Sequence, residues 1–139
     1  MRTQIYNLIK SEYEKAGNKV VDQVAFEKNV DWYLDNDLAA LAVDDTDTVW
    51  AIGLARRLDS VEQIPEHFTN TEAGGIVSVD FVYGQITEDI EILFDQLLAR
   101  FPGVQYIAFQ RELKSDSRVR LFRVSKVRAL LKLLGTAGP

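Results

Sequence analysis

Asp80 is the residue whose position most directly suggests chemistry. It lies within an apolar run rich in β-branched and aromatic residues, IVSVDFVYG over residues 76–84. An isolated ionised carboxylate is unfavourable among apolar side chains, so Asp80 must find a partner, reach a cleft or hold a raised pKa. It is a candidate general base. The structural alternative is an ion pair with Arg56, Arg57 or Arg111 from a neighbouring strand. Arg56 and Arg57 alternate across a strand, so only one of them can face this site.

His67 is the only histidine in the chain and the natural catalytic partner for Asp80. It lies in residues 59–74, the longest segment without a clear helix or strand pattern, and loops of this length in small domains are often functional. The alternative is an exposed loop histidine with no role. Tyr83 and Tyr106, near predicted strand ends, are candidates for a general acid or for core aromatics.

Several kinds of active site are excluded by the residue types. There is no cysteine, which excludes disulfides, thiolate nucleophiles and zinc–cysteine sites. The sequence also lacks a phosphate-binding P-loop and a serine nucleophile elbow. Asp31, Asp35 and Asp37 are close in sequence without the spacing of a calcium-binding loop, so a solvated acidic face is the simpler interpretation. We therefore predict no metal site and no cofactor.

Length and hydropathy predict one soluble domain. The chain has 139 residues, of which 47% are hydrophobic, and this is enough to bury a core. No apolar run reaches the ~18 residues that a membrane-spanning helix needs. We expect no membrane contact and a location that is cytoplasmic or virion-associated.

The charge is unevenly distributed along the chain. The net charge is −5, but residues 114–132 hold seven of the sixteen basic residues and one acid. The acidic remainder disfavours nucleic-acid binding, whereas the basic end suits RNA, an acidic partner or the acidic body of a neighbouring copy. The alternative is that these Arg and Lys residues lie on a solvated strand edge and prevent it from pairing with other chains and aggregating. The residues predicted to contact a protein partner are Arg118, Arg120, Arg123, Lys126, Arg128, Leu130, Leu131, Lys132 and Leu134.

The elements around Asp80 predict a βαβ unit. Its strand is followed by a segment, Thr87–Arg100, with apolar residues spaced as on one face of a helix. A second apolar run, residues 104–109, follows the helix end at FPG. Two strands joined by one helix should lie parallel in the same sheet.

The preceding segments predict two helices and a hairpin. Apolar spacing predicts helices over residues 2–16 and 22–36, with Asp22 as the N-cap of the second. Two apolar runs around the turn DDTD predict the hairpin. Gly53 in its second strand marks a bulge or a close backbone approach.

A last antiparallel strand, RVRLFRV, and a basic amphipathic helix capped by Ser125 complete the prediction. The fold class is α/β (α+β): a mixed sheet in the order α-α-β-β-β-α-β-β plus a C-terminal helix, with helices on both faces. Residues 1–125 form the domain, and residues 126–139 form the basic C-terminal helix and tail.

This order resembles the GNAT acyltransferase fold over roughly residues 1–125. Within that superfamily, the segments GGIVSVDFVYG, ARFPGVQYIAFQRE and RVRLFRV are similar to those of the RTX toxin-activating lysine acyltransferases. The resemblance implies that Asp80 is the catalytic aspartate, that an acyl-carrier protein is the donor and that a lysine is the acceptor. The chain also resembles short GNAT-like proteins of tailed-phage particles.

The chain departs from these enzymes at two places. GNAT enzymes bind the pyrophosphate of acyl-CoA in a glycine-rich turn at a helix N-terminus. Here residues 83–89 contain one glycine and two carboxylates, Glu88 and Asp89, and no histidine precedes the hairpin. We therefore predict a binding or structural component of an assembly such as a phage virion, without acyl-CoA-dependent activity. The alternative is a lysine N-acyltransferase that uses an acyl-carrier protein, with Asp80 and His67 as its pair.

Overall fold

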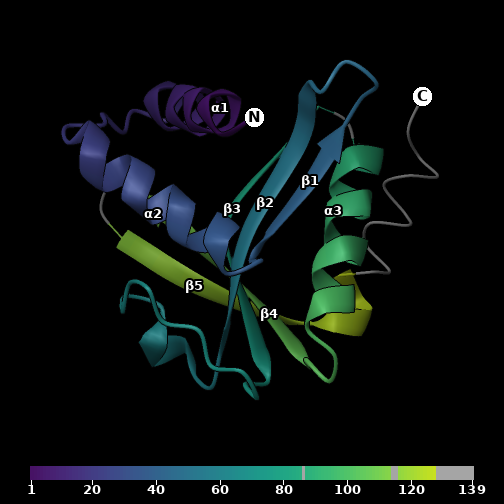
Figure 1. The fold of residues 1–139 in the computed structure, drawn as a ribbon. Helices are drawn as coiled ribbons and strands as arrows, with labels where there is room; N and C mark the ends of the chain where they lie inside the picture. The colour runs from purple at the N-terminus through teal and green to yellow at the C-terminus, as the bar shows by residue number, and fades with distance from the viewer. Residues whose placement is uncertain (86, 114–115, 128–139) are drawn as a thin grey trace.

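The computed structural model describes residues 1–85, 87–113 and 116–127, and its elements follow the predicted order (Figure 1). The α-helices are α1 (Arg2–Lys15), α2 (Gln23–Asp35) and α3 (Thr87–Arg100). The strands are β1 (Ala39–Val43), β2 (Val49–Leu58), β3 (Ile76–Gly84), β4 (Tyr106–Leu113) and β5 (Asp116–Arg123). A short 3-10 helix, η1 (Val61–Gln63), lies in the long loop after β2.

The strands form one mixed sheet in the order β1-β2-β3-β4-β5. Neighbouring strands are antiparallel except β3 and β4, which run parallel with Ile76 opposite Tyr106 and Val79 opposite Phe109. α3 connects these two strands. The βαβ unit and the α+β class predicted from the sequence are therefore confirmed.

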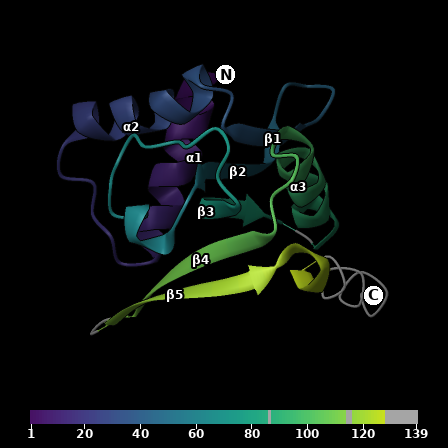
Figure 2. The same ribbon diagram turned by 90° about the horizontal axis from the view of Figure 1, so that it is seen from below.

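Helices lie on both faces of the sheet (Figures 1 and 2). α1 and α2 cover one face and α3 covers the other. Successive residues of β2 point to opposite faces: Leu54 lines a pocket with residues of α2, whereas Gly53 lies under α3. A Cβ at Gly53 would lie 3.3 Å from Cδ1 of Leu97. The glycine thus permits the close approach that its position in the strand predicted.

A hydrophobic core fills the space between the sheet and the helices. Ile5 and Ile9 of α1, Ile52 of β2, Leu93 of α3 and Ile107 of β4 are each at most 1% exposed. Complete burial of such a side chain contributes about 1.5–3 kcal/mol to stability. The core therefore holds α1 and α3 firmly against opposite faces of the same strands.

Local capping groups define where elements begin. The carboxylate of Asp22 accepts a hydrogen bond from the backbone N–H of Ala25 at 3.1 Å, which confirms the predicted N-cap of α2. At η1, Ser60 and Gln63 form a capping box, in which each side chain binds the other residue's backbone. The loop after β2 therefore begins with an ordered turn.

Candidate functional site

A β-bulge in β3 positions Asp80 on the face of the sheet that α2 covers. Ala55 of β2 pairs with Val79, and the preceding residue Leu54 pairs with Phe81, so Asp80 is one extra residue on β3. A bulge disrupts the ladder locally and turns side chains in a new direction. In this protein it directs a carboxylate toward α2 from the middle of an apolar strand.

Hydrogen bonds occupy both carboxylate oxygens of Asp80. Oδ2 accepts from the hydroxyl of Tyr33 at 2.5 Å and from Nε of Arg56 at 2.7 Å. Oδ1 accepts from Oγ of Ser78 at 2.8 Å and from Nη2 of Arg56 at 3.3 Å. A carboxylate offers about four acceptor positions, and these bonds use them. The predicted structural alternative, an ion pair with a neighbouring arginine, is therefore observed, with Arg56 as the partner.

Arg56 connects this carboxylate to the loop after β2. Its side chain is 4% exposed. Nη2 and Nη1 donate to the backbone carbonyls of Ile64 and Glu66, both at 2.8 Å. Burial lowers the pKa of the guanidinium, but the hydrogen bond and the charge of Asp80 outweigh burial and raise it overall. Arg57 faces away, as the predicted alternation requires, and donates to the backbone carbonyls of Gly74, at the end of the same loop, and Pro102, in the loop after α3.

Tyr33 links α2 to the same ion pair. Only 8% of Tyr33 is exposed, and burial, followed by the negative charge of Asp80, raises the pKa of its phenol well above 10.0. A phenol with so high a pKa keeps its proton at neutral pH. It therefore donates a hydrogen bond to the carboxylate of Asp80 at neutral pH.

A pocket of about 280 Å³ lies beside Asp80, between α1, α2 and the sheet. Four aromatic rings contribute to its wall, and the side chain of Asp80, which is 19% exposed, is its charged group. The residues that line it are Tyr13, Ala25, Phe26, Asn29, Val30, Tyr33, Leu54, Asp80 and Phe81.

The structure does not join His67 to Asp80 by a hydrogen bond. The side chain of His67 is exposed and forms no hydrogen bond or ion pair within the described residues. Its neighbours anchor the loop: the carbonyl of Glu66 binds the buried arginine, and Phe68 packs edge-on against Trp32 with ring centroids 5.7 Å apart. Phe68 has a φ of 59°, a left-handed conformation that is rare for aromatic residues. The loop thus covers Arg56 while His67 points outward.

The tyrosines singled out in the sequence lie outside this site. Tyr83 and Tyr106 are partly buried and pack against hydrophobic clusters, which is the core role considered for them. The tyrosine that contacts Asp80 is Tyr33, and it was not singled out. Ser78 was also missed, although a serine two residues before an aspartate on one strand is the available signal for a shared face.

α3 packs tightly against the end of β3. A Cβ at Gly84 would lie 2.8 Å from Cγ1 of Ile90 and 3.3 Å from Cβ of Asp89. Glu88 in the same first turn is exposed. Acidic side chains therefore surround the helix N-terminus, where an anionic ligand would need positive or neutral groups.

The acidic cluster at the end of α2 is paired with α1. Arg2 donates to Asp31 at 2.7 Å and to Asp35 at 2.6 Å, and the hydroxyl of Tyr6 also donates to Asp31. The predicted solvated acidic face is therefore partly neutralised by a basic residue. Within the described residues, no group of three or more side chains is arranged to hold a metal ion, and no helix is long and apolar enough to cross a membrane.

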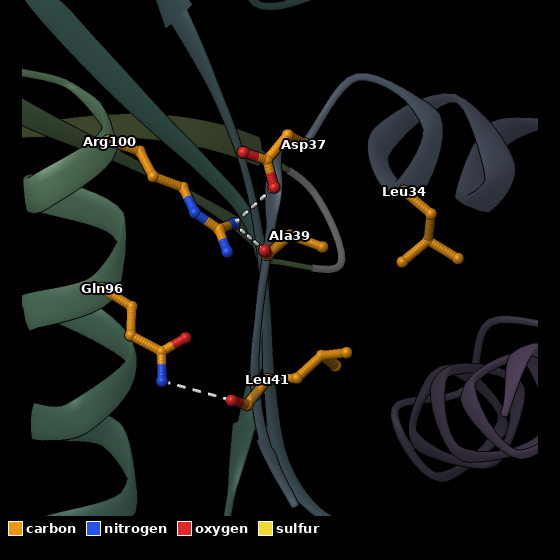
Figure 3. A pocket seen from close by; sticks show the side chains of 6 residues that line it. All are labelled: Leu34, Asp37, Ala39, Leu41, Gln96 and Arg100. Carbon is orange, nitrogen blue, oxygen red and sulfur yellow. Dashed lines mark hydrogen bonds and ion pairs between the residues drawn. The ribbon is translucent and has the colours of Figure 1, made fainter.

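A second pocket, of about 250 Å³, lies at the outer edge of β1 (Figure 3). Gln96 of α3 donates to the carbonyl of Leu41 at 3.2 Å, and Arg100 donates to the carbonyl of Ala39. Arg100 also lies 3.6 Å from Asp37. Side chains of α3 thus cap the carbonyls that an edge strand would otherwise present to another strand.

The basic C-terminal region is described only in part. Residues 124–127 are helical, and Val127 is 7% exposed. The start of the C-terminal helix was predicted correctly, but Ser125 lies within it and is not the predicted N-cap, because the helix already includes Val124. Arg123 and Lys126 are exposed, and the ammonium of Lys126 lies 5.6 Å from the centroid of the Phe122 ring. The predicted contacts that fall outside the described residues or side chains are Arg118, Arg120, Arg128, Leu130, Leu131, Lys132 and Leu134.

No protein-family model, curated protein or solved structure matches the chain. The mixed sheet with helices on both faces is compatible with many folds. The resemblance to GNAT proteins therefore stays a prediction from the order of elements.

Proposed function

We propose that this chain is a binding protein of the GNAT-like type, and that copies of it associate through the basic C-terminal segment, residues 126–139. The observation that carries this proposal is the engagement of Asp80. Its carboxylate is bound by Tyr33, Arg56 and Ser78. A general base needs a free lone pair directed at the substrate. The lone pairs of this carboxylate accept hydrogen bonds from side chains of α2, β2 and β3.

An acidic stripe on α3 supports the proposal by offering a complementary surface. The exposed residues Glu88, Ile92, Asp95 and Ala99 recur every three or four positions, so they share the outer side of the helix. Ile92 is 48% exposed between two carboxylates. Such a surface suits a partner that presents both apolar and basic side chains.

The C-terminal segment has that composition. Its first ten residues, KVRALLKLLG, place basic residues among leucines in the pattern of an amphipathic helix. Because the segment is basic and α3 is acidic, association between copies places opposite charges together. Another protein with an acidic helix would be recognised in the same way.

The assembly that we propose is a tailed-phage particle, with a location that is virion-associated or cytoplasmic. The support is the resemblance in size and pattern to short GNAT-like virion proteins. Particles of that kind are built from repeated copies of a chain. A chain with an acidic surface on α3 and a basic C-terminal segment is suited to such repeated contacts.

A peptide titration tests the association. The peptide of residues 124–139 is added to the ¹⁵N-labelled chain that ends at Val127, a truncation that keeps the buried side chain of Val127 in place. We expect saturable chemical-shift changes on the outer side of α3. They should weaken as ionic strength rises from about 0.05 to about 0.5 M, because exposed charges are screened.

Two controls accompany this titration. A peptide in which Gln replaces every Lys and Arg should bind more weakly, and Asp95→Asn in the labelled chain should weaken binding of the native peptide. Shift changes that do not saturate, or equal binding of the neutral peptide, would contradict the proposal.

A lysine N-acyltransferase that takes its acyl group from a carrier protein is the second candidate. The observation in its favour is that Asp80 lines a pocket of about 280 Å³ and keeps 19% of its side chain exposed. Transfer from an acylated carrier protein to a lysine peptide, abolished by His67→Ala, would support this function. His67 is exposed, so its replacement should leave the fold unchanged.

A further inference from the structure

The pocket beside Asp80 is open and small. Val30, Tyr33 and Leu54 are buried in its wall, and its remaining lining residues are half-buried or exposed. Pockets for complete small molecules begin at about 300 Å³, slightly above the volume of about 280 Å³ found here. The pocket is therefore suited to one end group of a ligand.

Three aromatic rings line the pocket, and the ring of Tyr13 lies nearly perpendicular to each of the other two. The ring of Tyr13 lies 6.0 Å from that of Phe26, at 73°, and 5.7 Å from that of Phe81, at 83°. Tyr33 adds a fourth ring to the lining. Aromatic faces attract a cation within about 6 Å of the ring centre, and several rings around one space form the cages that bind methylated ammonium groups.

Asp80 adds negative charge to this pocket without offering a free acceptor. Its oxygens already accept from Tyr33, Ser78 and Arg56. Arg56 is not among the lining residues, is 4% exposed and directs its other donors to loop carbonyls. The group that faces the pocket is thus the carboxylate, and its counter-ion lies behind it.

This arrangement distinguishes between kinds of ammonium ion. A primary ammonium carries three N–H donors, and burying them without acceptors is unfavourable. A quaternary ammonium has no N–H group, so it leaves no donor unsatisfied at a carboxylate whose acceptor positions are occupied. It still gains from the negative charge and from the aromatic faces.

We propose that this pocket binds a quaternary ammonium group, enclosed by Tyr13, Phe26 and Phe81 and attracted by Asp80. The group is carried either by a small molecule of the choline type or by a trimethylated lysine of a partner protein. Binding here rests on the pocket alone and is independent of association through the C-terminal segment.

An NMR titration of the full ¹⁵N-labelled chain tests the proposal, with tetramethylammonium as the probe and methylammonium as the control. We expect saturable shifts at residues of α2 and β3, and binding of tetramethylammonium about tenfold tighter than that of methylammonium. Absence of saturable binding, or tighter binding of methylammonium, would overturn the proposal.

Variants that spare the ion pair sharpen this test. Phe81→Leu removes a ring but keeps an apolar side chain, and it should raise the Kd about three- to tenfold. Asn29→Asp adds a carboxylate to the lining and should lower the Kd, whereas Asn7→Asp makes the same change at an exposed position outside the lining. An unchanged Kd in Phe81→Leu would overturn the proposal.

Two further titrations identify the source of the group. Choline represents the small molecule, and a trimethyllysine peptide, compared with its unmethylated form, represents the protein partner. If choline or the trimethyllysine peptide binds, and Phe81→Leu weakens that binding, the result supports the source that this ligand represents. Failure of both ligands, together with tetramethylammonium, rejects the site.

Discussion

Asp80→Ala should lower the free energy of unfolding by about 3–5 kcal/mol, because it removes one partner of a buried ion pair. The guanidinium of Arg56, 4% exposed, would lose its counter-ion. Tyr33 and Ser78 would lose the acceptor for their hydroxyl groups. A domain of this size has about 5–15 kcal/mol of stability in total, so the variant should be close to the limit of folding.

The double variant Arg56→Met/Asp80→Ala distinguishes the contribution of this ion pair to stability from a general loss of packing. Removing both charges leaves no uncompensated charge in the interior, and such replacements are often close to neutral. We expect the double variant to lose less stability than the sum of the two single losses. The difference, the coupling free energy, should be at least about 1 kcal/mol.

Urea unfolding, followed by the fluorescence of Trp32 and Trp50, measures these stabilities. Asp35→Ala is the matched control, because its carboxylate pairs with Arg2 but is 62% exposed, and its urea midpoint should stay near that of the wild type. A loss below about 1 kcal/mol for Asp80→Ala, or single losses that simply add, would contradict a stabilising role for the ion pair.

Three other predictions concern backbone space and titration. Gly74→Ala should lower the thermal midpoint markedly, since a Cβ there would lie 2.3 Å from a backbone carbonyl oxygen of β2, whereas Gly75→Ala should change it little because nothing lies within 4 Å. Burial raises the pKa of Tyr33 above 10.0, so the stability that the protonated phenol contributes is complete below pH 10 and declines at higher pH. Tyr33→Phe should therefore flatten the alkaline part of a stability–pH curve. The hydrogen bond from Tyr6 lowers the pKa of Asp31 below 3.8, so that contribution is lost as pH falls below about 3.8, and Asp31→Asn should reduce the acid dependence.

The βαβ unit was predictable because its periodicity is strong. The apolar stripe of residues 87–100 predicted a helix with the bounds that the structure has. The helix separates two apolar runs, and that order favours parallel strands joined by a crossover. The mixed sheet and the positions of α1 and α2 followed from similar local patterns.

The surroundings of Asp80 were only partly predictable. From the sequence, three arginines were candidates for its structural partner. The pairing with Arg56 depends on the bulge at Asp80, which no residue type in the sequence predicts. Tyr33 is 47 positions away in the chain, so its contact depends on how α2 crosses the sheet. The aromatic pocket was missed for the same reason, because its rings come from α1, α2 and β3.

Sedimentation velocity of the full chain, beside the chain that ends at Val127, tests the proposed association most directly. At low ionic strength the full chain should sediment as an oligomer that dissociates as salt is added, and the shortened chain should sediment as a monomer. Monomers in both samples, or the same oligomer in both, would contradict association through the basic C-terminal segment.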